Sequence, residues 1–151
     1  MMNIKTKFPP PLVALTFGFL INYTKNIFPK IEIGWGDVFG SIIITFGITI
    51  ILSAIISFKK YKTTITPLKP SNATKLIVSG VYKFSRNPMY LGLLLVLTGI
   101  SAILNPIGGL FSIPLFILYL NLFQIIPEEN AMINLFKDEF LEYKENVRRW
   151  I

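Results

Sequence analysis

Residues 89–126 carry no charged side chain and have the sequence MYLGLLLVLTGISAIL-NP-IGGLFSIPLFILYLNLFQII. A helix needs about 20 mostly apolar residues to cross a membrane, so this stretch is long enough for two crossings. Asn105-Pro106 divides it, and proline both interrupts a helix and disfavours the helical conformation in the preceding residue, which predicts a tight turn. We therefore expect a helical hairpin with spans at about residues 89–104 and 107–126. The alternative, one long kinked helix, would overrun a hydrocarbon core of about 30 Å.

Two further apolar runs, at about residues 10–28 and 35–58, precede this hairpin. Only 15% of the 151 residues are charged and the mean hydropathy is +0.59, whereas soluble domains contain about 25% charged residues. Pro9–Pro11 open the first run and no small-residue cleavage site follows it, so we expect a retained helix rather than a signal peptide. The composition predicts one all-α integral-membrane domain over residues 1–151, with four transmembrane helices.

The basic residues predict the orientation of these spans. Every lysine and arginine except Lys25 and Lys30 lies before the first span, in the loop 59–88 or after the last span. Four spans would place these three regions on one side, and cytoplasmic segments carry an excess of Lys and Arg. We therefore expect both termini and the loop 59–88 to be cytoplasmic. The net charge of +7 then follows from topology and attraction to anionic lipids, and we expect no nucleic-acid partner.

An amphipathic helix is expected after the last span, at about residues 127–150. Pro127 suits the first turn of a helix, and Glu128 and Glu129 suit the positive end of its dipole. An interfacial anchor on the membrane surface is the alternative interpretation of this segment. The apolar positions follow helical spacing and form one stripe, which comprises Met132, Phe136, Phe140, Tyr143, Val147 and Trp150.

The chain contains neither cysteine nor histidine. Thiolate nucleophiles, disulfides, thiolate metal sites and imidazole bases or ligands are therefore excluded, and we expect no metal site. Any chemistry must use carboxylates, Lys, Arg, Tyr, amides and the backbone.

The loop 59–88 is longer than most connections, and long loops are usually functional or disordered. Its first part, up to Lys75, fits a flexible basic linker that contacts lipid headgroups. Residues 78–92, VSGVYKFSRNPMYLG, differ because they combine glycines, aromatics, cations and a proline just before an apolar run. Gly92 would permit close helix packing. This density of functional side chains predicts a binding site at the membrane surface.

Each part of this segment suits a polar, partly aromatic ligand. Gly80 permits a turn, and Pro88 can begin the helix, whose first amides attract an anion. Arg86 offers a planar fork for a carboxylate. Tyr82 and Tyr90 offer aromatic faces for a purine or a cation.

Two adjacent carboxylates, Glu128 and Glu129, follow the last span directly. The hairpin would place them beside the start of the third span. Carboxylates next to apolar membrane are costly unless a cation is near. That cation could be Arg86, Lys83 or Arg149, or it could belong to a ligand.

The pattern Gly80-x-Tyr82-x-x-Ser85-Arg86-Asn87-Pro88-x-Tyr90-x-Gly92, followed by Glu128-Glu129 and by Arg148-Arg149-Trp150, resembles a known family. It is similar to the integral-membrane methyltransferases of the isoprenylcysteine carboxyl methyltransferase and phospholipid methyltransferase families. The resemblance covers roughly residues 66–151, and the first two spans match only in being apolar. Asn87 stands where the prenylcysteine enzymes usually have histidine, which puts a histidine-dependent role in doubt.

The resemblance implies methyl transfer from S-adenosylmethionine, with S-adenosylhomocysteine as product, to a lipophilic acceptor such as a lipid or a prenylated substrate. It implies that Glu129 and Arg149 are catalytic. An ionised carboxylate or thiolate acceptor needs no base, whereas an amine would have to lose a proton to Glu129 or to water. The absence of histidine therefore favours an ionised acceptor. The implied cofactor-binding residues are Val78, Gly80, Tyr82, Arg86, Asn87, Pro88, Tyr90, Glu128 and Glu129.

Two alternatives remain open at this point. A sterol-reductase-like enzyme has a similar Arg-x-Pro-x-Tyr element and binds NADPH, although 151 residues look short for it. A non-enzymatic helical scaffold or lipid-binding subunit explains the spans and the basic loop but not the Glu128-Glu129 pair. Binding of S-adenosylhomocysteine, of NADPH or of neither distinguishes the three.

Overall fold

The computed structural model describes residues 8–28, 34–61 and 74–151, and this part of the chain is helical without strands. Residues 62–73, most of the predicted basic linker, lie outside the described residues, as do Lys5, Lys7 and Lys30. The elements are α1 (Pro10–Tyr23), η1 (Thr24–Asn26), α2 (Gly36–Tyr61), η3 (Gly80–Lys83), α3 (Pro88–Leu104), α4 (Pro106–Leu120), η4 (Asn121–Ile125) and α5 (Ile126–Asn146).

The predicted hairpin is confirmed: α3 ends at Leu104 and α4 begins at Pro106. Asn105 occupies the turn, and its side-chain oxygen accepts a hydrogen bond from the Gly108 amide at 2.9 Å, which caps α4. Its amide nitrogen donates to the Ile21 carbonyl and to the Thr24 hydroxyl, each at 3.1 Å. The turn therefore also anchors the end of α1.

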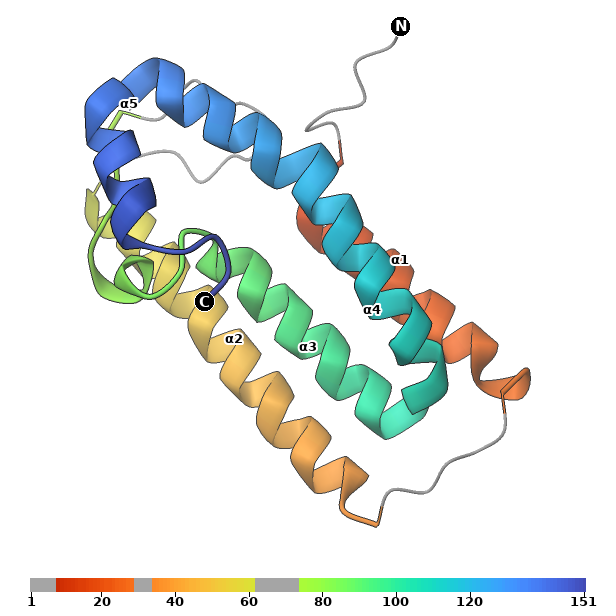
Figure 1. Cartoon of the computed structure of the whole chain (residues 1–151). Coiled ribbons are helices and arrows are strands. Elements are labelled where there is room, and N and C mark those ends of the chain that lie inside the picture. Colours follow the sequence, from red (N-terminus) through yellow and green to blue (C-terminus); the bar gives the residue numbers. More distant parts are fainter. Residues whose placement is uncertain (1–7, 29–33, 62–73) are drawn as a thin grey trace, which may run out of the picture.

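Helix α3 lies between α2 on one side and α1 and α4 on the other (Figure 1). It packs against α2 through two glycine pairs, Gly40 with Gly99 and Gly47 with Gly92. A Cβ atom on Gly92 would lie 2.7 Å from the Gly47 carbonyl oxygen, and one on Gly99 would lie 2.5 Å from the Gly40 carbonyl oxygen. Small residues let helix backbones approach closely, so the expectation for Gly92 is confirmed.

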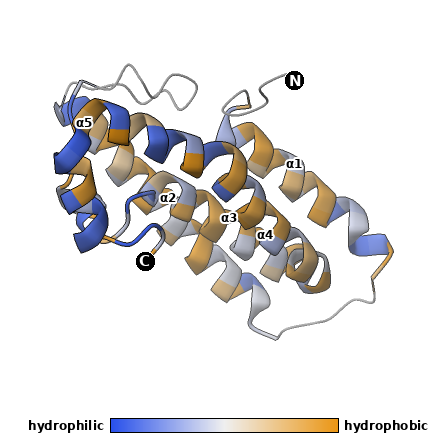
Figure 2. Ribbon diagram, turned by 45° about the horizontal axis from the view of Figure 1, so that its top comes forward, coloured by the Kyte–Doolittle hydropathy of each residue, from blue (hydrophilic) through white to orange (hydrophobic). Residues whose placement is uncertain are grey.

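The outer faces of the bundle are apolar, whereas hydrophilic residues gather on the far part of α5 (Figure 2). Among the described residues, two helices are long and apolar enough to cross a membrane: α2, and the continuous helix Pro106–Asn146. Only 17% of the most apolar stretch of α2 is buried inside the protein, which is unlike the core helix of a soluble domain. Helix α3 is apolar but shorter, so length supports two of the four predicted spans.

Helices α4, η4 and α5 form one continuous helix, where we expected a span followed by a separate helix. Its middle part, η4, is π-helical and ends at Ile125, two residues before Pro127. Proline lacks the amide that a regular helix uses at that position, and its ring collides with the carbonyl four residues earlier. The wider π turn gives this ring room, so the helix continues through the proline.

Helix α5 bends at Lys137, whose φ of 46° and ψ of −119° are not helical. Beyond the bend the chain turns back toward the start of α3 (Figure 1). The helix ends at Asn146 and Val147 is extended, so the predicted helical range of about 127–150 is wrong at its end. The physical reason is an alternative set of partners, because residues after 146 hydrogen-bond to the loop before α3.

Candidate active site

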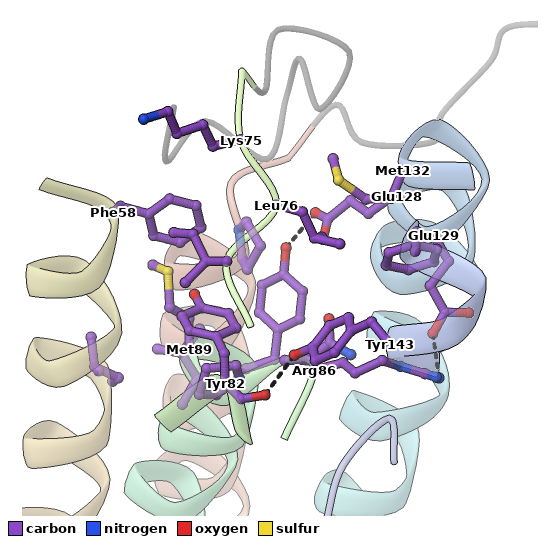
Figure 3. Close-up of a pocket in the computed structure, with 18 of the residues that line it drawn as sticks. Phe58, Lys75, Leu76, Tyr82, Arg86, Met89, Glu128, Glu129, Met132 and Tyr143 are labelled. Carbon is purple, nitrogen blue, oxygen red and sulfur yellow. Dashed lines mark hydrogen bonds and ion pairs between the residues drawn. The ribbon is translucent and has the colours of Figure 1, made fainter. Parts of the chain in front are cut away.

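A cavity of about 370 Å³ lies where the first turns of α3 and α5 meet (Figure 3). This volume falls within the range of about 300–1,000 Å³ typical of small-molecule pockets. Most of its wall is apolar or aromatic, with a few ionisable groups. The lining residues are Pro9, Pro10, Pro11, Ile51, Phe58, Lys75, Leu76, Ile77, Tyr82, Arg86, Asn87, Pro88, Met89, Tyr90, Leu93, Glu128, Glu129, Met132, Phe140 and Tyr143.

Seven residues of the predicted site line this cavity, and three do not. Val78 is 44% exposed and lies outside it. Gly80 has a φ of +64° and forms the turn that opens η3. Arg149 contacts Glu129 but does not itself line the cavity. The seven that line it are Tyr82, Arg86, Asn87, Pro88, Tyr90, Glu128 and Glu129.

The turn at Gly80 positions Tyr82, which is buried against α2. Its ring meets Phe58 edge-on, with ring centroids 5.8 Å apart. Its carbonyl oxygen accepts a hydrogen bond from the Tyr143 hydroxyl at 2.7 Å. Helix α5 is thereby attached to η3, and burial raises the pKa of the Tyr82 phenol well above its usual value.

Two arginines hold Glu129. Arg86 Nη2 lies 2.9 Å from Glu129 Oε1, and Arg149 contacts both carboxylate oxygens, with Nε–Oε1 at 3.0 Å and Nη2–Oε2 at 2.7 Å. The cations expected near the glutamate pair are therefore Arg86 and Arg149. The hydrogen bond to Glu129 raises the pKa of the Arg149 guanidinium, which keeps it charged.

Glu128 has a different environment from its neighbour. Its carboxylate accepts a hydrogen bond from the Tyr90 hydroxyl, and the described residues give it no ion pair. Burial raises the pKa of Glu128 to about 7, the Tyr90 hydrogen bond opposes this shift, and the Glu129 charge adds to it. Glu128 therefore changes its protonation near neutral pH.

The Arg86 guanidinium is largely occupied by protein groups. Nη1 donates to the Lys144 carbonyl at 3.0 Å, and Nη2 contacts Glu129. Nε is a buried donor without a hydrogen-bond partner among the described residues. A buried, unpaired donor is costly, so a ligand oxygen at this position would be favourable.

The segment 147–150 supports the loop before α3, which the sequence did not predict. The Arg86 amide donates to the Arg148 carbonyl at 3.1 Å, and the Asn87 side chain donates to the Arg149 carbonyl at 3.0 Å. Trp150 Nε1 donates to Asn121 Oδ1 at 3.3 Å, within η4. The Asn87 side-chain amide thus links the loop before α3 to the segment 147–150. Its hydrogen bond to the Arg149 carbonyl places Asn87 beside the cavity.

The apolar wall was also missed, apart from the stripe that contains Met132, Phe140 and Tyr143. Pro9–Pro11 form part of the wall, and Gln124 Nε2 fixes the chain there by donating to the Phe8 carbonyl at 2.8 Å. Three consecutive prolines before an apolar run can be recognised in the sequence, but they do not indicate which residues they contact.

A helical bundle with apolar outer faces and buried ionisable groups at one end is typical of functional membrane proteins. The chain belongs to the phospholipid methyltransferase family, whose family model matches residues 35–139. This membership confirms the resemblance drawn from the two motifs.

The relatives with assigned activities are methyltransferases. The chain is 31% identical over 139 residues to protein-S-isoprenylcysteine O-methyltransferase of Homo sapiens, covering 89% of this chain and 48% of that protein. The enzyme of that name from Xenopus laevis is 29% identical over 139 residues, with 90% and 48% covered. An uncharacterized protein of Haemophilus influenzae is 41% identical over 63 residues, which are 42% of this chain and all of that protein.

The chain spans about half the length of the methyltransferases that it matches. No solved structure shows a significant match to it.

Proposed function

We propose that this protein is an integral-membrane methyltransferase that transfers a methyl group from S-adenosylmethionine to a lipophilic acceptor at the cytoplasmic face. One observation carries the proposal: two motifs about 40 residues apart meet at one cavity. Arg86 pairs with Glu129, 43 positions away, and Tyr90 bonds to Glu128, 38 positions away. Family membership and the names of the relatives support methyl transfer as the reaction.

The cavity residues fit the groups of this cofactor. Arg86 Nε, buried and unpaired among the described residues, would donate a hydrogen bond to an oxygen of its carboxylate. Glu128 would attract its cationic groups, and the faces of Tyr82 and Phe58 would contact the adenine or the sulfonium. When bound, S-adenosylmethionine supplies a methyl group on a sulfonium. The protein's contribution is to align an acceptor with that group and to exclude water.

In this proposal Glu129 and Arg149 act as a fixed pair. The guanidinium groups of Arg86 and Arg149 both donate hydrogen bonds to Glu129, so the carboxylate orients Arg86 toward the cavity. Gly80 and Asn87 shape the loop, since one provides its turn and the other its bond to the Arg149 carbonyl. Val78 does not line the cavity, and its role in cofactor binding stays a prediction.

A second, apolar cavity of about 510 Å³ supports a lipophilic acceptor. It lies between α1 and α3 and shares Pro11 and Leu93 with the first cavity. An acceptor could therefore place its head at the ionisable groups and its hydrocarbon tail in this groove. The other lining residues are Ala14, Leu15, Gly18, Phe19, Asn22, Val96, Leu97 and Ile100.

The proposal retains four spans, at about residues 10–28, 35–58, 89–104 and 107–126, in one domain over 1–151, with cytoplasmic termini and loop. The start of α1, the start of α3 and the start of α5 all line the same cavity. They therefore lie at one end of the bundle, as the distribution of basic residues requires. Helix α3 has 17 residues and is about 26 Å long, slightly less than a hydrocarbon core of about 30 Å.

Calorimetric titration of S-adenosylhomocysteine into the detergent-solubilised protein tests this function. We expect saturable binding that weakens by about tenfold or more, or about 1.4 kcal/mol, in Arg86→Ala and in Glu129→Ala. Lys83→Ala and Glu145→Ala are matched controls, because both side chains are exposed. A folded protein that does not bind S-adenosylhomocysteine would contradict the proposal. Titration of NADPH would then separate a reductase from a non-enzymatic scaffold.

A further inference from the structure

Two side-chain amides lie within the apolar sequence of residues 107–126, those of Asn121 and Gln124, and both belong to the π-helical segment η4. Polar groups in an apolar span are costly and usually have a function, and π-helical turns are frequent at functional sites. Gln124 Nε2 donates to the Phe8 carbonyl at 2.8 Å. Asn121 Oδ1 accepts a hydrogen bond from Trp150 Nε1 at 3.3 Å. One short segment of helix therefore binds both ends of the described chain.

Trp150 anchors the C-terminal segment to the core of the bundle. Its side chain is half-buried and packs against the apolar cluster that includes Tyr90, Leu97 and Leu120. An indole ring has a single polar group, an N–H donor, which needs an acceptor where water is excluded. Asn121 supplies that acceptor, so the apolar contact and the hydrogen bond fix the same ring in one place.

The residues just before this tryptophan reach the candidate active site by two routes. The Arg149 side chain donates two hydrogen bonds to Glu129, which also pairs with Arg86. The Arg148 carbonyl accepts a hydrogen bond from the Arg86 amide at 3.1 Å. The Arg149 carbonyl accepts one from the Asn87 side chain at 3.0 Å. A shift of the chain end would therefore displace both the side chain and the backbone of Arg86.

The ion pair of Arg149 needs such an anchor. The Arg149 side chain is 35% exposed, and partly exposed ion pairs contribute little stability by themselves. The bend in α5 also acts against the ion pair, because Lys137 has a φ of 46° and a ψ of −119°. Residues with a side chain rarely adopt this conformation, and it persists only where surrounding contacts hold it. The bent half of α5 must therefore be held beyond its end, where Trp150 lies.

We propose that Asn121 and Trp150 are positioning residues of the cofactor site, which act by fixing the segment 147–150 against the loop before α3. The inference rests on the proposed methyltransferase function and deepens it. Neither residue lines the cavity, so each acts through Arg149 and through the carbonyl that holds the Arg86 amide. A terminal tryptophan that only anchored the chain in the membrane interface would depend on its aromatic ring and not on Asn121.

Three variants isolate this hydrogen bond. Asn121→Leu removes the acceptor and keeps a side chain of similar size. Asn121→Asp keeps an oxygen at the same place, whether or not the carboxyl group is protonated, so it should restore the bond. Trp150→Phe keeps an aromatic ring and removes the donor, and it provides the same test should Asn121→Leu fail to fold.

Two controls accompany these variants. Gln124→Leu removes the other amide of η4, whose partner is the Phe8 carbonyl, and so reports what destabilisation of this segment does without release of the segment 147–150. Trp35→Phe makes the same chemical change as Trp150→Phe on a side chain that is 68% exposed.

The first measurement needs no ligand. Hydrogen exchange of the Arg86 amide reports on its bond to the Arg148 carbonyl, and mass spectrometry of peptides that contain residue 86 follows this exchange in the detergent-solubilised protein. We expect exchange about threefold faster or more in Asn121→Leu and in Trp150→Phe, because local opening becomes easier when a hydrogen bond that holds the segment is lost. Asn121→Asp and both controls should exchange at the wild-type rate.

The second measurement is the calorimetric titration of S-adenosylhomocysteine. We expect its affinity to fall by about threefold to fivefold in Asn121→Leu and in Trp150→Phe, the usual effect of one hydrogen bond. The double variant should lose no more than either single variant, because both changes remove the same bond. Asn121→Asp should recover the wild-type affinity, and Trp35→Phe should leave it unchanged. A merely structural role would show additive losses and no recovery.

Wild-type exchange at Arg86 in both Asn121→Leu and Trp150→Phe would overturn the inference. So would faster exchange with unchanged affinity for S-adenosylhomocysteine, or a loss of affinity in Trp150→Phe that Asn121→Leu does not share. In each of these cases, binding of S-adenosylhomocysteine to the wild-type protein leaves the proposed function standing. A folded wild-type protein that does not bind this ligand would remove the proposed function, and this inference with it.

Discussion

Arg149 donates two hydrogen bonds to the Glu129 carboxylate, from Nε at 3.0 Å and from Nη2 at 2.7 Å. Glu129 lies in the first turn of α5, and Arg149 lies beyond its end. The bend at Lys137 is what lets the two residues meet, because it turns the second half of α5 back toward its own start. The ion pair therefore fixes both the fold of this segment and the position of Arg86, which shares the same carboxylate.

Replacing Arg149 should weaken ligand binding in a way that depends on geometry as well as charge. Arg149→Ala leaves Glu129 with one cation, and we expect affinity for S-adenosylhomocysteine to fall by about tenfold, or about 1.4 kcal/mol. Arg149→Lys should recover only part of this loss, because an ammonium lacks the planar fork. Arg148→Ala is the control, since that neighbouring side chain is exposed, and calorimetry measures all three. Equal loss in Arg148→Ala would contradict a specific role for Arg149.

The sequence predicted the hairpin and the start of α3 well, because these features depend on local rules. A proline that cannot continue a helix marks Pro106, and a proline that suits a first turn marks Pro88. It also predicted that the two motifs would approach each other, since a hairpin returns the chain to its starting end. The pairing of Arg86 with Glu129 follows from that topology.

The sequence could not predict the end of α5 or the partners of Asn87. The stripe through Phe140 and Tyr143 has helical spacing up to Trp150, and spacing alone gives no sign of the bend at Lys137. After Asn146 the chain gives up the helical conformation that the spacing favours, because its carbonyl groups accept hydrogen bonds from the loop before α3. The sequence shows that the glycines of each helix are seven residues apart. It does not show that those of α2 pair with those of α3, because contact between helices is not a local property.

Gly92 should tolerate no larger residue. A Cβ atom there would lie 2.5 Å from Ile51 Cγ1 and 2.7 Å from the Gly47 carbonyl oxygen, so Gly92→Ala must separate α2 from α3. Overpacking of this kind costs about 1–3 kcal/mol, and thermal unfolding of the detergent-solubilised protein should show a lower Tm. Gly34→Ala is the control, because nothing lies within 4 Å of the added atom. A Tm for Gly92→Ala equal to that of the control would mean that the helices are not in contact there.

Gly18 offers a way to fill the groove between α1 and α3. An added Cβ would meet Leu97 Cδ1 only at 4.0 Å, so Gly18→Ala should be accommodated, whereas Gly18→Leu should occupy the space expected for a hydrocarbon tail. We expect Gly18→Leu to raise KM for a farnesylated acceptor by about tenfold, as burial of one or two fewer methylenes would. A short-chain acceptor with the same nucleophile should be unaffected, and so should S-adenosylhomocysteine affinity. If the long and short acceptors respond alike, the tail does not lie in this groove.

Glu128 should give the protein a measurable dependence of stability on pH. Its pKa is raised from 4.5 to about 7 in the folded protein, so the folded state binds a proton more tightly than the unfolded state. The contribution of Glu128 to stability is therefore fully present below about pH 4.5 and is lost as the pH rises to about 7, by up to about 3 kcal/mol. Glu128→Gln cannot ionise and should remove this part of the slope, so its Tm should exceed that of the wild type most clearly above pH 7. Parallel Tm profiles of the two proteins across this range would show that Glu128 is solvated. That result would contradict the buried environment that distinguishes Glu128 from Glu129.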